Sequence, residues 1–329
     1  MRKTTFLAFV LGLCACSGLF GQQDPMFTKY MFNSLSFNPG YAGSNEHMTL
    51  NLIHRQQWIG FDGAPVTQSF TMHTPLRNER VGVGLSAIND KIGPTGTLDV
   101  NGAYAYRIPI GKLKLAIGIQ AGVTNWRADW TKLDIKDPDP VYSENVNKWL
   151  PNFGTGIYLS GKKAYIGLGC PKLVEYDLRT PDLANTPIYA KTYRHYFGTA
   201  GLALPLGGEN LIFKPSILVK SAAWFGSFRK DDAFKNIGSP TEVDLDLSLF
   251  FFQTLWVGVA YRTAIELGDS SNDSADFWVA YFLKNGLRIG AAYDYTLTDI
   301  RKVSSGSFEV MVGYEFDYKT KRVVGPRYF

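Results

Sequence analysis

Histidine and cysteine are the residues most able to hold a metal ion or act as a nucleophile, and this chain offers few of them. No two of its four histidines stand at the spacing of metal ligands. Two of its three cysteines lie before residue 17, in a segment expected to be removed, which leaves Cys170 without a partner for a disulfide. The histidines are His47, His54, His73 and His195.

Ser69 and His73 form the best nucleophile–base candidate. Both occupy odd positions of one expected strand, so they face the same side, which we interpret as a polar lining. The acidic run at 134–139 lacks the order and the glycine of a calcium loop. The glycines at 82 and 84 are followed by no helix, so they do not form a phosphate loop. We therefore expect no catalytic residue, no metal and no cofactor.

Acidic and basic side chains recur instead at every second position of β-like segments. The clearest example is the hairpin Glu242–Arg262, in which the run from 242 to 251 alternates between acidic or hydroxyl side chains and apolar ones. A period of two predicts a strand with one charged face and one apolar face. The apolar positions are Val243, Leu245, Leu247, Leu249 and Phe251, opposite Glu242, Asp244, Asp246 and Ser248.

The charged faces would meet inside a barrel. Two interpretations stay open: ion pairs that fill a lumen, or charges that select a permeant. The predicted lumen charges are Arg107, Asp244, Asp246, Arg288, Glu309 and Glu315, together with Arg55, Arg262 and Asp317.

Composition limits the protein classes. The chain has 329 residues, 45% of them hydrophobic, with 22 Phe, 18 Tyr and 33 Gly, which favours strands and tight turns. A net charge of +5 gives no argument for nucleic acid. Downstream of residue 21, no run of about 18 apolar residues could form a membrane helix, so a membrane location would require a closed barrel.

The first 21 residues resemble an export signal. Arg2 and Lys3 precede an apolar core from 6 to 15, and Gly21 offers a small residue before the expected cut. Lipidation at Cys16 is a weaker alternative. We expect residues 22–46 to form an ordered arm or plug, 47–318 a barrel and 319–329 a tail.

Fourteen candidate strands follow, joined alternately by long loops and short turns. This asymmetry is typical of outer-membrane barrels, which have short periplasmic turns and longer outer loops. A soluble β-sandwich or barrel is the alternative, but fourteen strands enclose a lumen too wide for side chains to fill. The strands are expected at 47–57, 65–76, 80–89, 96–108, 112–128, 150–160, 164–170, 193–205, 210–221, 242–252, 255–261, 275–284, 286–297 and 306–317. The long loops are expected at 58–64, 90–95, 129–149, 171–192, 222–241, 263–274 and 298–305.

Aromatic residues near strand ends are expected to mark the two membrane interfaces. They are Trp126, Trp130, Trp149, Tyr158, Trp224, Tyr261, Trp278, Tyr281, Tyr293 and Tyr295.

Two groups of residues in the arm and the first hairpin resemble the PorP/SprF family. The arm contributes Asp24, Pro25, Tyr30, Met31, Phe32, Asn33, Asn38, Pro39, Tyr41 and Gly43, and the hairpin contributes Arg55, Gln57, Trp58, Gly63 and Pro65. The likeness covers essentially the whole mature chain, including the ending at 326–329. Gly40 departs from the family, in which Ala is commoner.

This resemblance implies a non-enzymatic outer-membrane protein of the type IX secretion system of Bacteroidota, with members tied to gliding motility. The implied partners are membrane lipid, the C-terminal domain of a secreted cargo protein such as a large adhesin, and other secretion components. A porin-like channel for small solutes is the alternative. We expect the loops 129–149, 171–192 and 222–241 to offer the cargo surface.

Overall fold

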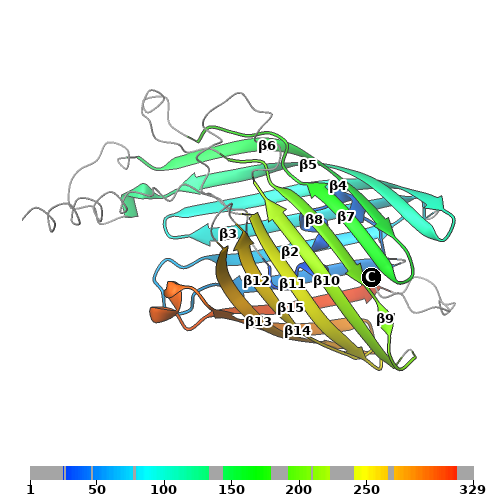
Figure 1. The fold of residues 1–329 in the computed structure, drawn as a ribbon. Coiled ribbons are helices and arrows are strands. Elements are labelled where there is room, and N and C mark those ends of the chain that lie inside the picture. The colour runs from blue at the N-terminus through cyan, green and yellow to red at the C-terminus, as the bar shows by residue number, and fades with distance from the viewer. Residues whose placement is uncertain are drawn as a thin grey trace, which may run out of the picture.

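The computed structural model describes residues 25, 27–45, 47–76, 79–132, 144–178, 192–208, 210–222, 241–265 and 270–316. In this part of the chain, fifteen strand segments form one antiparallel sheet, which closes into a barrel because the first strand, β1, pairs with the last, β15 (Figure 1). The two-residue segment β9 continues β8 along the same neighbour, β10. The prediction of a closed β-barrel of about fourteen strands is therefore confirmed.

The strands differ in length, with β4, β5 and β6 the longest. Their bounds are β1 Met48–Gln56, β2 Val66–Pro75, β3 Val81–Ile92, β4 Thr95–Ile110, β5 Leu113–Ala128, β6 Val146–Ser160, β7 Ala164–Cys170, β8 Tyr196–Leu202, β9 Leu204–Pro205, β10 Leu211–Ser221, β11 Thr241–Phe251, β12 Leu255–Ile265, β13 Ser270–Phe282, β14 Leu287–Thr296 and β15 Ser307–Phe316.

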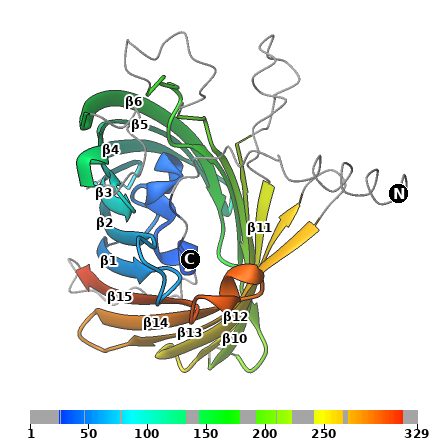
Figure 2. The same cartoon turned by 90° about the vertical axis from the view of Figure 1, so that its left-hand side faces the viewer.

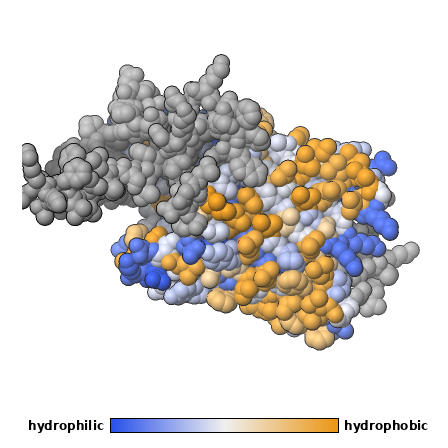
Figure 3. Space-filling model, in the orientation of Figure 1, coloured by the Kyte–Doolittle hydropathy of each residue, from blue (hydrophilic) through white to orange (hydrophobic). Residues whose placement is uncertain are grey.

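The polar and apolar residues that alternate along each strand face the interior and the outer wall of the barrel in turn. On β11, Asp244 and Asp246 are buried in the interior, whereas Leu245 and Leu247 are 46% and 51% exposed on the outer wall. Apolar side chains cover much of the wall in Figure 3, and hydrophilic ones gather toward its two ends. Among the described residues, each strand except the two-residue β9 pairs with a neighbour on both sides, which satisfies backbone groups that would otherwise face lipid.

Three expected loops are shorter than predicted. β3 continues to Ile92 and β4 begins at Thr95, so the expected loop 90–95 is a tight turn in which Gly93 adopts φ +54°. β12 reaches Ile265 and β13 begins at Ser270, and β6 starts already at Val146. The polar residues of these segments resemble loop sequence, but cross-strand pairing continues the ladders past them.

Three residues of the predicted aromatic interface lie inside the barrel instead. Trp126, Tyr158 and Trp278 are buried, because they occupy even positions of strands whose even positions face inward. Five others are exposed, as a place at the membrane interface requires: Trp149, Tyr261, Tyr281, Tyr293 and Tyr295. Trp224 lies outside the described residues.

Residues 27–45 lie within the ring of strands (blue in Figure 2). They form three 3₁₀ turns at Tyr30–Phe32, Ser34–Ser36 and Pro39–Tyr41. No helix of the described residues is long and apolar enough to cross a bilayer. We call residues 27–45 the inner arm. The expected signal, 1–21, and tail, 319–329, lie outside the described residues, as does most of the loops 129–149, 171–192 and 222–241.

Candidate functional site

The inner arm touches the barrel wall backbone to backbone, at wall positions that carry no side chain. A Cβ atom built on Gly118 of β5 would lie 2.2 Å from the Gly40 nitrogen, and one on Gly82 of β3 would lie 2.0 Å from the Ala42 oxygen. Real Cβ atoms do not approach so closely. The wall therefore contains a glycine floor, made by Gly82 and Gly118, that admits the arm.

Asn38 fixes the turn above that floor. Its side-chain amide donates to the Ile157 carbonyl of β6 at 3.1 Å, and its Oδ1 atom accepts the Gly40 N–H at 2.9 Å. The second contact caps the 3₁₀ turn Pro39–Tyr41. Gly43 then adopts φ +68°, a conformation that favours glycine, before the chain enters β1.

Aromatic residues of the arm pack against the interior wall. Phe32 meets Trp256 edge to face at a centroid distance of 5.1 Å. Tyr41 meets His73 in the same way at 5.1 Å. These contacts bury apolar surface of the arm against aromatic and imidazole rings of the interior wall. Further anchors are Phe37, which stacks on Phe197 at 5.4 Å, Tyr30, whose hydroxyl lies 2.7 Å from Ser216 Oγ, and Met31, half-buried against two core clusters.

Glu309 of β15 holds the start of the arm. Its two carboxylate oxygens accept the backbone N–H groups of Thr28 at 2.9 Å and Lys29 at 3.0 Å. The Thr28 hydroxyl donates to the Asp294 carboxylate at 2.7 Å. Charge-assisted bonds to backbone N–H groups are among the stronger hydrogen bonds in proteins. We call Thr28, Lys29, Asp294 and Glu309 the latch.

Arg55 completes the latch from β1. Its guanidinium lies 2.6 Å from Asp294 and 3.5 Å from Glu309, and it donates to the Thr28 hydroxyl at 2.5 Å. Its side chain is almost fully buried, and so are those of both acids. The family-motif arginine therefore joins the arm to two strands on its own side of the barrel.

A second charged group lies on β11, β12 and β13. Arg262 donates from Nε to Asp244 at 2.7 Å, and its Nη2 atom lies 3.7 Å from Asp276. Asp246 accepts the Trp278 indole N–H at 2.6 Å. Asp244 thus has a cationic partner on the next strand, which favours the interpretation of structural ion pairs, whereas Asp246 is hydrogen-bonded to a neutral indole.

A third group surrounds Arg288 of β14. Its guanidinium lies 2.9 Å from Glu315 and donates to the Asn51 side chain at 2.9 Å. Asn51 in turn donates to the Phe32 carbonyl of the arm at 2.9 Å. Arg107 lies apart from all three groups, where it donates to the Ser44 carbonyl at 3.4 Å. Asp317 lies outside the described residues.

The family-motif residues of the first hairpin bridge loops at one rim. The Gln57 N–H donates to the Pro65 carbonyl at 2.9 Å and closes the β1–β2 loop. Trp58, at φ +45°, donates its N–H to Ser307 at 3.2 Å, and Gly63 accepts the Gly93 N–H at 2.9 Å. This loop therefore joins the start of β15 to the β3–β4 turn.

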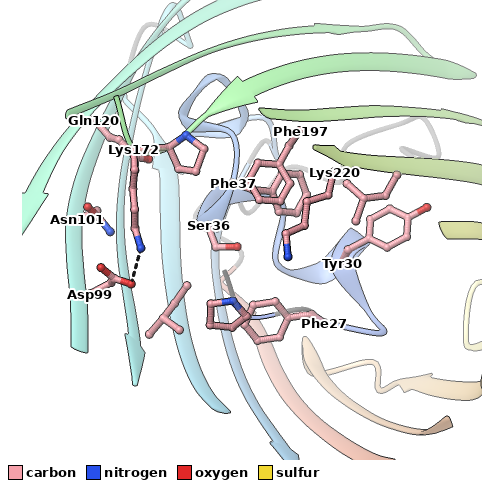
Figure 4. A pocket seen from close by; sticks show the side chains of 14 residues that line it. Phe27, Tyr30, Ser36, Phe37, Asp99, Asn101, Gln120, Lys172, Phe197 and Lys220 are labelled. Carbon is pink, nitrogen blue, oxygen red and sulfur yellow. Dashed lines mark hydrogen bonds and ion pairs between the residues drawn. The ribbon is translucent and has the colours of Figure 1, made fainter. Parts of the chain in front are cut away.

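A narrow cavity remains between the arm and the wall (Figure 4). Lys172, in the segment after β7, lines one side of it and lies 3.0 Å from Asp99, and Lys220 lies 3.5 Å from Glu242. Pro25, predicted from the family motif, lines it as well, whereas Asp24 lies outside the described residues. The space is thus bordered by ion pairs and by aromatic arm residues.

Sequence reasoning missed several members of these groups. The inward positions of Asp276 and Asp294 follow from the same alternation that identified Asp244, so the signal was available. Lys29 and Thr28 carry no such signal, because the arm does not alternate. Among the described residues, no group of three or more His, Cys, Asp or Glu side chains is placed to hold a metal ion.

Comparison with solved structures finds outer-membrane barrels. A monoaromatic hydrocarbon channel, CymD, is 13% identical, with a TM-score of 0.52 over 85% of this chain and 91% of that one. A Pseudomonas aeruginosa FadL homologue is 14% identical, with a TM-score of 0.47 over 92% and 97%. At such identities the likeness to CymD supports the fold alone. No curated protein sequence matches the chain.

A family model does match, over residues 19–314. It is described as type IX secretion system membrane protein PorP/SprF. The match covers the inner arm, the first hairpin and nearly all of β15. Together with the closed barrel, it shows that the chain belongs to the PorP/SprF family of outer-membrane proteins of the type IX secretion system.

Proposed function

We propose that this protein is a non-enzymatic partner for secreted cargo, a barrel that supports export or surface anchoring of large type IX substrates such as adhesins. The observation that carries the proposal is the occupied lumen. The inner arm is bound by the latch, by aromatic contacts and by the glycine floor. A filled barrel is better suited to act as a rigid scaffold for its loops than to act as an open channel for solutes.

The proposed cargo surface lies at the rim where the longer connections gather. The described residues at the base of these connections show how the rim is stabilised. Asn152 of β6 donates to the Val174 carbonyl and accepts the N–H groups of Leu173 and Val174, each within 3.0 Å. These bonds tie the segment after β7 to the wall. Loops held by such a scaffold are common binding sites.

Deletion of the gene provides the test. We expect one or a few large proteins to disappear from the cell surface while general secretion persists. Re-expression of the wild-type chain is the control, and the measurement is the surface proteome by mass spectrometry. An unchanged surface proteome in the deletion strain would refute the cargo role. The proposed export signal at 1–21 predicts that a chain lacking it stays out of the outer membrane.

A porin-like channel remains the second candidate, because charged side chains border the cavity beside the arm. We expect the purified barrel to show little conductance in planar bilayers. A variant that lacks residues 27–45 is expected to conduct. Steady conductance by the intact protein, at the level of a general porin, would favour the channel.

A further inference from the structure

A row of polar side chains interrupts the apolar outer wall. His54 of β1, Gln68 of β2 and Asn89 of β3 are direct cross-strand neighbours. His54 and Gln68 are exposed on the outer wall, and the Asn89 amide lies 3.4 Å from the Gln68 oxygen. Polar groups that face lipid are costly unless they find a hydrogen-bonding partner. The row therefore requires an explanation on the outside of the barrel.

Two basic residues lie closer to the rim than the polar row, with Lys91 one outward position beyond Asn89 on β3 and Arg127 two strands away on β5. Lys91 of β3 pairs with Gly96 of β4, which pairs with Arg127 of β5. Both basic side chains are exposed. Neither forms an ion pair with a carboxylate among the described residues.

Gly96 brings the Arg127 guanidinium toward Lys91. A Cβ atom on Gly96 would lie 3.0 Å from Arg127 Nε, so the arginine side chain lies across the bare backbone of β4. Two unpaired cations thus flank one glycine on the outer wall, and they create a positive site for an anionic group.

An apolar groove adjoins the polar row on the other side. It lies on the outer wall, and Ala87 is the small outward-facing side chain among its lining residues. Its apolar walls come from Leu52, Phe70, Leu98, Val310 and Val312, with His54, Gln68 and Asn89 at one edge. The order along the strands is therefore apolar groove, neutral hydrogen-bonding row and cationic pair.

This order matches the depth profile of a lipid. The rim in question carries the ends of β1, β3 and β5 and the starts of β2, β4 and β6, the side on which barrels of this kind have their outer loops. A lipid placed here would have acyl chains in the groove, amide or hydroxyl groups beside the polar row, and phosphate next to the two cations. A protein partner would not need acyl-sized space below the charges.

We propose that the outer wall of β1–β5 is a binding site for a phosphorylated glycolipid of the outer leaflet, with its phosphate on Lys91 and Arg127 and an acyl chain in the groove. The site lies on the face opposite the lumen. It is independent of the proposed cargo role, and it can fail without affecting that role.

The test uses the full barrel, refolded in neutral detergent and incubated with lipid A, with phosphatidylglycerol or with phosphatidylcholine. Native mass spectrometry measures the lipid that remains bound. Lipid A is expected to stay bound best. Each basic residue near an anionic lipid surface contributes a factor of about five, so the double variant Lys91→Glu/Arg127→Glu is expected to bind at least ~25-fold more weakly.

The matched control is Lys112→Glu, an exposed cation in the β4–β5 turn at the opposite rim. It is expected to keep wild-type lipid A binding. A second variant, Gln68→Leu/Asn89→Leu, keeps both cations. It is expected to weaken the binding of lipid A more than the binding of phosphatidylglycerol. Barrel folding is checked for all variants by heat-dependent migration on gels.

Three results would overturn the proposal. They are equal retention of lipid A by the wild type and the double variant, equal loss in the Lys112 control, and displacement of lipid A by a co-purifying protein that requires Lys91 and Arg127. Equal binding of phosphatidylglycerol and lipid A would contradict the glycolipid assignment.

Discussion

The carboxylate of Glu309 binds the backbone of Thr28 at 2.9 Å, which joins residues 281 positions apart. One is on the last strand of the barrel and the other is near the start of the inner arm. Because a carboxylate contacts backbone N–H groups, the bond depends on the path of the arm as well as on its side chains. It fixes where the arm enters the lumen.

Glu309→Gln is predicted to loosen the arm. The amide has one acceptor oxygen for two N–H donors, and it removes a charge that faces Arg55. We expect a loss of about 1–3 kcal/mol in arm binding, the usual cost of a buried group left unsatisfied. The rate at which a protease cleaves the arm in the folded barrel measures this loss of arm binding. Glu79→Gln, a partly exposed glutamate between β2 and β3 that pairs with Lys114 of β5, is the control and should leave the arm protected.

Gly118→Ala is predicted to expel the arm from its floor. The new methyl group would lie 2.2 Å from the Gly40 nitrogen, so arm or wall must shift. Gly102→Ala on β4 is the matched control, because its Cβ would meet nothing closer than 4.0 Å. Both barrels should fold. Planar-bilayer conductance should rise only for Gly118→Ala, and equal conductance of the two variants would argue against the floor.

Alternation was sufficient to predict most of the wall. It placed Asp244 and Arg107 inside and Leu245 outside, because a period of two fixes the face once a strand is recognised. The same rule, applied strictly, would have moved Trp278 from the membrane interface to the interior. Its aromatic side chain suggested a place at the membrane interface. The odd or even position along the strand, however, decides whether a side chain faces lipid or the lumen.

Partners across the lumen could not be predicted in this way. Arg55 and Asp294 become neighbours only because the barrel closes between β15 and β1 and because β14 aligns in one register. The apolar content of the arm indicated burial. The sequence of the arm does not indicate, however, that Gly40 contacts Gly118 of the wall. Such contacts depend on the register of the whole sheet, which the sequence of one strand does not contain.

Arg262→Met is predicted to destabilise the barrel. It leaves Asp244 and Asp276 buried without their cation, and breaking a buried pair on one side costs about 3–5 kcal/mol. Lys112→Met, which removes an exposed cation from a turn, should change stability by less than about 0.5 kcal/mol. Urea unfolding in lipid vesicles compares the two. Similar midpoints would show that the acids find other partners.

Lys29 makes binding of the arm depend on pH. Burial lowers the pKa of its ammonium group from 10.5 to about 8, although Glu309 and Asp294 act in the opposite direction. The Nζ atom donates to the Ala291 carbonyl at 2.9 Å, a bond that a neutral amine can also make. A lowered pKa means that the bound arm carries fewer protons than the free arm between pH 8 and 10.5.

Binding of the arm should therefore strengthen as pH rises through that window, by about 1–2 kcal/mol between pH 8 and 9.5. Below pH 8 the lysine is charged in both states, and its contribution becomes constant. Lys29→Met should bind the arm with no such slope, while Lys112→Met should keep it. Protease protection of the arm at pH 7.5 and 9.5 supplies the measurement. Equal slopes for the wild type and Lys29→Met would assign the dependence to another group.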